Sequence, residues 1–512
     1  MLTFNKRPVG CAAAVLCASL LLGACQNGES REPVADRAET GSAGPSPPAA
    51  LAPAELTWYY PVRELQKDQS AVEEAVNRYT RAKLNATIRL KPVAMSEYAQ
   101  RMNTVLAANE PVDILWDASW LFNYMSAYAK GALLPLDELL DKYGADVKKA
   151  LPKMLFDTAR IEGKLYAIPG YQTITNREGF YIQKRFVDKY RIDVARIKTF
   201  EDMYPYMERI RQGEPGVTPI IFDKGGLYGS MAIELGFEYL TDTLVGIDVA
   251  HPAKAVNVYE LPAYQTYLKR MRELYVHGYV PPDIGTIKSF VAQTKTGQVA
   301  MQYHAVLKPG GEEMFGDLFG GNAMVAVPIT EPYVNKSQVI GTMQSIARQS
   351  KQPERAMMFL NLLNTDPELF NLLAYGIEGK HYTRVSAGTV RPIPGSGYAE
   401  KIDHWVFGNV FNAYTTEGQN PAVAEMTLRM NESAKASPVL GFTFNPEPVQ
   451  AAIANVTTVI EAYCPAMDTG SIDAQLVYDE FIAKLKAAGA DAIVAEAQRQ
   501  LDAWYKAKEG RT

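Results

Sequence analysis

The sequence predicts an α/β fold that is divided into two lobes or more. Short β-prone runs alternate with helical patterns near the start of the chain, which is typical of parallel sheets crossed by helices. The chain has 512 residues, of which 47% are hydrophobic, so it exceeds the usual size of one hydrophobic core. Its last part shows helical spacing only, which indicates added C-terminal helices.

The first predicted strand is residues 56–60, a β-prone run that ends at Pro61. A helical pattern over residues 70–84 comes next and precedes a second strand at residues 86–93. A helix over residues 97–109 then leads to a third strand at residues 112–116. Strand, helix, strand, helix, strand in this order predicts a parallel sheet, whose ligands bind beyond the carboxyl ends of the strands.

The middle of the chain is rich in helical patterns, with turns wherever glycine and proline cluster. From Tyr478 to Tyr505 apolar residues recur at helical spacing, and Gly489 divides this stretch into two helices. We expect these helices to pack on the second lobe.

The start of the chain is typical of a bacterial lipoprotein signal. Lys6 and Arg7 precede a short apolar run, and the small residues Gly23 and Ala24 precede Cys25. Residues 1–24 are therefore expected to be removed, and Cys25 to carry the lipid anchor. Residues 25–55 are rich in Pro, Ala, Gly and Ser and predict a disordered tether. We expect a protein outside the cytoplasm that is held at the membrane without crossing it.

Composition argues against several classes of protein. The formal net charge is −5, and loss of Lys6 and Arg7 makes it more negative, which argues against a nucleic-acid partner. After cleavage Cys464 is the one cysteine besides Cys25, so no disulfide framework is expected. Five histidines and one spare cysteine argue against a transition-metal site, and we expect no metal and no cofactor.

Six short motifs occur in an order that resembles the extracellular solute-binding proteins of carbohydrate-type ABC importers, the family of maltose-binding protein. They are Pro-Val-Asp-Ile at residues 111–114, Gly-Ala-Leu-Leu-Pro-Leu at 131–136, Gly-Lys-Leu-Tyr-Ala-Ile-Pro at 163–169, Lys-Thr-Phe-Glu-Asp at 198–202, Gly-Gln-Val-Ala-Met at 297–301 and Lys-Gln-Pro-Glu-Arg-Ala at 351–356. Phe200 stands where the family often has tryptophan. Residues 375–382, 405–409 and 437–445 resemble the long lipoprotein subgroup with an extra C-terminal helical region.

This resemblance implies a two-lobe, type II periplasmic-binding-protein fold with a hinge. Residues 56–170 and 323–382 would form the first α/β lobe, and residues 171–322 and 383–512 the second, with the helical extension. The implied function is capture of a carbohydrate, most simply an oligosaccharide, by a monomer that delivers it to the permease subunits of an ABC transporter. Two alternatives stay open: a sugar-sensing module for a membrane signalling protein, and a secreted polysaccharide-degrading enzyme.

Sugar binding needs flat aromatic faces together with acids and amides that hydrogen-bond paired hydroxyls. Several residues at the predicted strand ends have these chemistries: Tyr59, Tyr60, Trp116, Asp117 and Trp120. The resemblance adds candidates near the crossings between lobes and on the second lobe: Tyr171, Gln172, His304, Trp405 and Asn409. For each aromatic residue, packing in the core is about as good an explanation as contact with a ligand. His304 can equally be a structural histidine.

The sequence favours a binding protein over an enzyme. A retaining glycosidase needs two carboxylates about 5 to 5.5 Å apart, and nothing in the spacing of Asp117, Glu178, Glu378 and Asp403 selects a pair. No serine nucleophile elbow, zinc motif or phosphate-binding loop occurs in the sequence. We therefore expect no catalytic residues.

Overall fold

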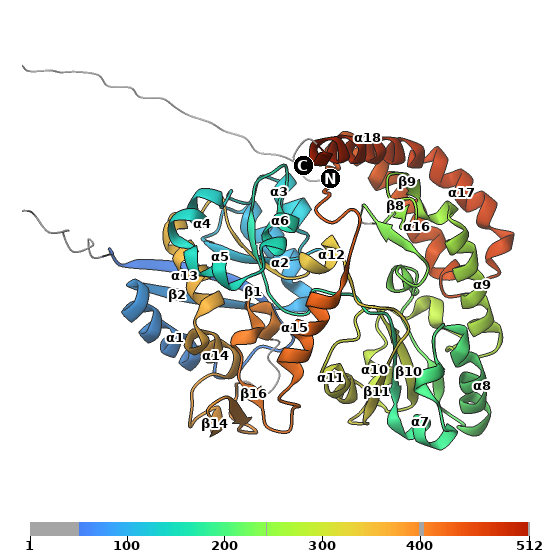
Figure 1. The fold of residues 1–512 in the computed structure, drawn as a ribbon, viewed down its shortest axis with the longest axis horizontal. Helices are drawn as coiled ribbons and strands as arrows, with labels where there is room; N and C mark the ends of the chain where they lie inside the picture. Colours follow the sequence, from blue (N-terminus) through green and yellow to red (C-terminus); the bar gives the residue numbers. More distant parts are fainter. Residues whose placement is uncertain (1–50, 242, 399–403, 510–512) are drawn as a thin grey trace, which may run out of the picture. The chain divides into compact units, whose positions relative to one another are not determined.

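A computed structural model describes residues 51–241, 243–398 and 404–509. Cys25, the signal and most of the predicted tether lie outside these residues, whereas all ten predicted ligand-binding residues lie within them. Residues 51–512 form one compact unit. It contains two hydrophobic cores, here named the first and the second lobe (Figure 1).

The first lobe is built on a five-stranded sheet with the order β2-β1-β3-β13-β4. Its strands are β1 (Ala54–Val62), β2 (Ala86–Ala94), β3 (Ile114–Asp117), β4 (Ala167–Pro169) and β13 (Met343–Ile346). Its helices are α1 (Gln69–Leu84), α2 (Met95–Ala107), α3 (Tyr124–Ala129), α4 (Asp137–Tyr143), α5 (Ala145–Ala150), α6 (Lys153–Ala159), α12 (Lys336–Val339), α13 (Pro353–Thr365) and α14 (Pro367–Tyr375). β1 pairs in parallel with β2 and β3, which confirms the predicted parallel order.

The predicted first strand is shorter than β1, which includes Pro61 and continues one residue past it. Proline lacks the N–H group that a paired strand needs. Here β3 pairs with β1 only at Trp58 and Tyr59, so Pro61 lies beyond that ladder. The strand can therefore continue although proline stands within it.

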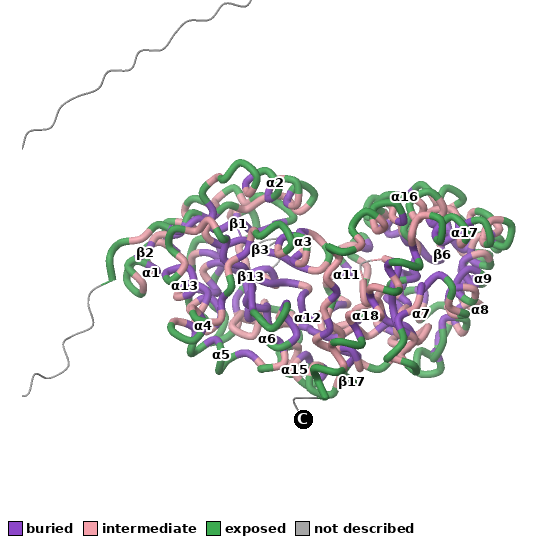
Figure 2. The backbone as a smooth tube through the Cα atoms, turned by 90° about the horizontal axis from the view of Figure 1, so that it is seen from above, coloured by how far each residue is buried: buried purple, intermediate pink, exposed green. Residues whose placement is uncertain are grey.

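The second lobe is built on a four-stranded sheet with the order β11-β5-β10-β6. Its strands are β5 (Gly179–Gln183), β6 (Thr218–Ile220), β10 (Val299–His304) and β11 (Met324–Pro328), beside a separate sheet of β7 (Phe237–Tyr239), β8 (Val245–Asp248) and β9 (Ala255–Asn257). Its helices are α7 (Lys184–Tyr190), α8 (Tyr204–Gly213), α9 (Pro262–Val276), α10 (Val291–Lys295), α11 (Gly311–Leu318), α16 (Gln450–Met467), α17 (Tyr478–Ala487) and α18 (Ala490–Glu509). The predicted break at Gly489 separates α17 from α18 and is confirmed. In each lobe most strand residues are buried, whereas helices such as α2 and α16 each have an exposed and a buried face (Figure 2).

The segments that connect the lobes run side by side. The backbone of Asn176 in the first connection pairs with Tyr333 of β12 (Tyr333–Val334) in the second. β12 in turn pairs in parallel with β17 (Lys435–Ala436) in the third connection. Three short segments from distant parts of the sequence thus form the hinge.

The packing differs from the lobe boundaries expected from the sequence. Tyr171 and Ile174 belong to the first core, whereas Met324 of β11 belongs to the second, so the first two connections lie several residues later than expected. Val390 and Phe407 also pack in the first core, although the resemblance predicts residues 383–512 in the second lobe. The chain returns to the second core only at Val439. The region around Phe407 fills the first lobe because it covers the end of β1.

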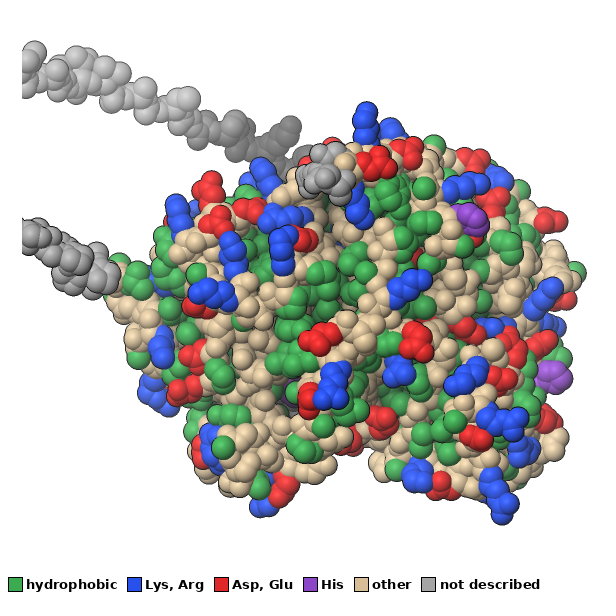
Figure 3. Space-filling view, viewed as in Figure 1, with side chains coloured by type: hydrophobic (Ala, Val, Ile, Leu, Met, Phe, Trp, Pro, Cys, Tyr) green, Lys and Arg blue, Asp and Glu red, His purple; other side chains and the backbone are tan. Residues whose placement is uncertain are grey.

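That region also contains α15 (Val423–Ser433) and a small sheet of β14 (Tyr382–Ser386), β15 (Thr389–Pro392) and β16 (Thr415–Thr416). Within the described residues no helix is both long and apolar enough to span a bilayer. Acidic and basic side chains are interspersed on the face of the described molecule that Figure 3 shows.

Candidate functional site

The candidate site is a cavity of about 610 Å³ that residues of both lobes line. The first lobe contributes the loop after β3, where Trp120 lies, and the start of α3. The hinge contributes Asn176, Tyr333 and Lys336. The second lobe contributes β7 and the N-terminal part of α16. This volume is within the range of pockets that hold small-molecule ligands.

Trp120 is the most exposed aromatic side chain of the cavity, with 55% of its surface accessible. Its indole N–H donates to the carbonyl of Gly341 at 2.8 Å, which fixes the ring beside the start of β13. Trp116 and Trp405 support it, with ring centroids 5.8 and 6.1 Å away. A rigid, exposed indole face is a suitable surface for an apolar face of a ligand.

The hinge brings polar atoms to the cavity. The buried side-chain oxygen Oδ1 of Asn176 has no hydrogen-bond partner among the described residues, and a buried acceptor of this kind is costly unless a ligand or water satisfies it. Glu238 accepts a hydrogen bond from the Tyr333 hydroxyl at 2.7 Å, and burial raises the pKa of this carboxyl. Burial lowers the pKa of Lys336 to about 7, and its ammonium contacts the hydroxyl of Thr443.

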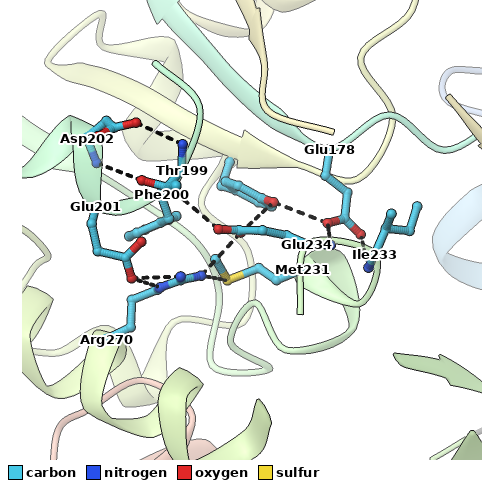
Figure 4. A network of polar contacts seen from close by, with 10 residues as sticks. Glu178, Thr199, Phe200, Glu201, Asp202, Met231, Ile233, Glu234 and Arg270 are labelled. Atoms are coloured by element: carbon cyan, nitrogen blue, oxygen red, sulfur yellow. Dashed lines mark hydrogen bonds and ion pairs between the residues drawn. The ribbon is translucent and has the colours of Figure 1, made fainter. Parts of the chain in front are cut away.

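A buried network positions the second-lobe loop that lines the cavity at Gly229 and Ile233 (Figure 4). The Glu178 carboxylate accepts the backbone N–H groups of Ile233 and Glu234, both at 2.9 Å. Burial raises the pKa of Glu178 to about 8. Arg270 forms ion pairs with Glu201 at 2.7 Å and with Glu234 at 3.2 Å, and its positive charge balances part of the negative charge of these two carboxylates. Glu178 lies two residues after the hinge residue Asn176. The network therefore connects the hinge to one wall of the cavity.

Of the ten residues predicted to contact ligand, Trp120 lines this cavity and the other nine do not. Tyr60 is buried against Trp58 and Phe407, with centroids 4.7 and 5.4 Å away. Tyr59 is buried beneath the guanidinium of Arg101. The strand end that was expected to be open is thus covered by residues from far along the chain.

Trp116 and Asp117 are also fully buried. The Trp116 indole donates to the Thr342 hydroxyl at 2.6 Å. Asp117 accepts from the Ser345 hydroxyl at 2.6 Å, and burial raises the pKa of its carboxyl to about 8. Both side chains join β3 to β13, so they position Trp120 from behind and do not face the cavity.

The candidates taken from the resemblance contact other residues of the protein and do not line the cavity. Tyr171 packs on Phe411 at a centroid distance of 4.8 Å, and the carbonyl of Gln172 accepts from the Asn431 amide at 2.7 Å. His304 is held beside Phe315, and burial lowers its pKa to about 4.

Trp405 and Asn409 were expected on the second lobe but pack with the first. Trp405 lies against the first core, and Asn409 donates to the carbonyl of Asn364 in α13 at 3.2 Å. Asn409 also caps the short helix η7 (Val410–Asn412). The segment stays in the first lobe until the third connection, which residue patterns did not indicate.

Sequence reasoning missed Asn176, Glu238, Lys336 and Gln450, which line the cavity. No local pattern distinguishes them from ordinary surface or hinge residues. Residues 437–445 resemble a subgroup motif, and Phe442 and Thr443 within them line the cavity. Among the described residues no cluster of histidine, cysteine and acidic side chains forms that could hold a metal ion.

Residues 64–368 match the family model for bacterial extracellular solute-binding proteins. The chain belongs to this family. A second match covers residues 438–506 and is to a domain of unknown function, DUF3502. In this solute-binding protein that domain comprises the segment after the hinge, α16, α17 and most of α18.

The solute-binding protein is 29% identical over 450 residues to a carbohydrate ABC transporter substrate-binding protein of Streptococcus pneumoniae serotype 4, covering 85% of this chain and 87% of the relative. Its structure is similar to that of the N-glycan transport solute-binding protein NgtS from S. pneumoniae, with a TM-score of 0.79, 26% identity and coverage of 89% and 100% of the two chains. A structure of NgtS in complex with Man5GlcNAc is also similar, with a TM-score of 0.72, 27% identity and coverage of 89% and 99%. These similarities confirm the predicted two-lobe α/β fold.

Proposed function

We propose that this solute-binding protein captures an oligosaccharide outside the cytoplasm and delivers it to the permease of an ABC transporter. The observation that carries the proposal is the exposed indole of Trp120 on the wall of a cavity that both lobes line. The same cavity is lined by Asn176, Glu238 and Gln450, whose side chains can bond sugar hydroxyls. The relative named as a carbohydrate transporter component and the NgtS complex with Man5GlcNAc support the same ligand class.

The mechanism follows from the hinge. Because both lobes line the cavity, a ligand that touches both walls stabilises the closed arrangement relative to the open one. A permease that recognises the closed arrangement then receives loaded protein preferentially. We further propose that Cys25 carries the lipid anchor and that the protein acts as a monomer.

Two alternatives remain distinguishable by experiment. A sensing module would bind the same sugar but would contact a signalling protein in place of a permease. A glycoside hydrolase would need two carboxylates flanking the scissile bond, whereas the cavity carboxylate Glu238 is held by the Tyr333 hydroxyl. We therefore propose that the protein binds its sugar without changing it.

The first test is a thermal-shift screen of the protein lacking its signal, with Man1GlcNAc, Man5GlcNAc, uronate oligosaccharides and amino acids as ligands. A ligand at 100 times its dissociation constant should stabilise the folded state by about 2.7 kcal/mol. Each ligand that gives a shift is recovered and its mass measured. Recovery of the intact sugar supports the proposal, and shortened products would favour the enzyme.

The Trp120→Ala variant tests the site itself. Loss of the indole face should weaken binding of the selected oligosaccharide at least tenfold, about 1.4 kcal/mol. The melting temperature without ligand should change little, because much of the side chain is exposed. The control is Leu476→Ala, which truncates an apolar side chain with 82% of its surface exposed outside the cavity. Equal affinities of wild type and Trp120→Ala would place the ligand elsewhere.

A further inference from the structure

The domain of unknown function at residues 438–506 reaches the cavity directly. Its first segment leaves the hinge, and Phe442, Thr443 and Phe444 on this segment line the cavity. Gln450 and Ile453, one turn apart at the start of α16, line it as well. The domain therefore supplies part of the lining of the cavity that Trp120 lines from the first lobe.

The lining segment is held from both sides. The Gln500 side chain on α18 accepts the backbone N–H of Asn445 at 2.7 Å and donates to its carbonyl at 2.9 Å. The Thr443 hydroxyl donates to the carbonyl of Arg160 at 3.2 Å and contacts the ammonium of Lys336, and both partners belong to the first-lobe side. A wall fixed in this way is preorganised, so little ordering cost falls on a ligand that binds it.

Helix α16 is fixed against the second lobe at its other end. Tyr264 on α9 donates to the Asp468 carboxylate at 2.7 Å, and Tyr267 donates to the Asp468 carbonyl at 2.6 Å. These contacts are buried and hold α16 in a set orientation on α9. Gln450 and Ile453 are thus presented to the cavity by a rigid element.

We infer that this domain of unknown function is a ligand-recognition element, in which Gln450 hydrogen-bonds hydroxyl groups of a bound oligosaccharide. The inference rests on the proposed function for the ligand class. A side-chain amide both donates and accepts, which matches the paired hydroxyls of a sugar ring. The neighbouring Ile453 is partly exposed and supplies apolar surface for the C–H faces of the same units, while the rings of Phe442 and Phe444 on the same wall are largely buried. By this inference the domain helps to determine which glycans the protein accepts.

The test compares wild type, Gln450→Ala and Gln475→Ala by isothermal titration calorimetry with Man5GlcNAc. Gln475 is a matched control because it is an exposed glutamine of the same domain that does not line the cavity. Gln450→Ala loses one hydrogen bond, so its dissociation constant for Man5GlcNAc should be about 3 to 10 times that of wild type. Gln475→Ala should bind as wild type does, and all three proteins should melt at similar temperatures without glycan.

The outcomes separate this inference from the proposed function. If wild type binds Man5GlcNAc and Gln450→Ala binds it equally well, the inference is overturned while the proposed function stands. An equal loss in Gln475→Ala would also overturn it, because the effect would then not depend on the cavity. If wild type binds no glycan, the proposed function fails and the inference fails with it.

Discussion

Single side chains in this protein divide between those that face the cavity and those that support it from behind. Trp120 is exposed, whereas its neighbours Trp116 and Asp117, from the same strand end, are fully buried. Successive side chains of a strand point to opposite faces of the sheet, and this explains only part of the difference in exposure. The packing of β13 against β3 covers the remaining face, since Ser345 and Thr342 bond the two buried side chains.

The buried carboxyl of Asp117 predicts a pH-dependent stability. Burial raises its pKa to about 8, above the ordinary value of an unfolded aspartate, which is about 4. The folded state therefore holds a proton that the unfolded state has lost, so stability falls as pH rises from about 4 to about 8. We expect Asp117→Asn to remove up to about 5 kcal/mol of this fall.

The measurement is the melting temperature of wild type and Asp117→Asn at pH 5.5 and pH 8.5. The difference between the two proteins isolates Asp117, because the other buried titratable groups are common to both. Asp479→Asn, at an exposed position of α17, serves as the control. Parallel pH curves for wild type and Asp117→Asn would show that Asp117 is already ionised in the folded protein.

At the scale of elements, the packing of α16 on α9 places the C-terminal domain at the cavity. Gly470 follows α16 and has φ +68°, and a Cβ atom there would lie 2.2 Å from the carbonyl oxygen of Met271 on α9. A backbone carbonyl cannot turn away as a side chain can. Only glycine therefore allows the two elements to approach this closely.

Gly470→Ala is expected to destabilise the protein and to loosen α16. The left-handed φ costs an alanine about 1 to 2 kcal/mol, and the clash with Met271 adds to this cost. The control is Gly418→Ala, which has φ +87° but no atom within 4 Å of its Cβ, so it measures the φ cost alone. Urea unfolding and hydrogen exchange of α16 to α18 measure the effect. Equal losses in the two variants would contradict the role of the close approach.

At the scale of the whole molecule, residues 51–512 form one compact unit. The two lobes of that unit are joined by three short segments that pair with one another at Asn176, Tyr333 and Lys435. Pairing of the segments limits the lobes to motion about one hinge. We expect the lipid anchor proposed at Cys25 and the compact unit to act independently, because Cys25 lies outside that unit.

Cys25→Ser is expected to release the protein from the membrane without changing its stability or its ligand binding. The proposed lipid would be attached to the Cys25 thiol, whereas the compact unit begins only at Leu51. Detergent phase partitioning of the expressed full chain measures the release. Cys464→Ala is the control, because this buried cysteine lies in the second core and should leave the anchor intact. Detergent partitioning of Cys25→Ser equal to that of wild type would exclude anchoring through Cys25.

The sequence by itself determined the alternation of strands and helices in the first lobe, the break at Gly489 and the family. These features depend on local periodicity, on turn residues and on short motifs, all of which occur within short stretches of the sequence. It also indicated Trp120, because an aromatic residue soon after a strand end tends to lie near the ligand edge of a parallel sheet.

Only the tertiary structure decided which residues face the cavity. Tyr60 is covered by Phe407, and Trp116 by Thr342, and these contacts join residues that are distant in the sequence. Asn176 and Gln450 meet at one cavity because the hinge and α16 bring together segments that no local pattern relates. Burial is a property of the whole packed chain, so a site between two lobes is determined by contacts that a single sequence does not display.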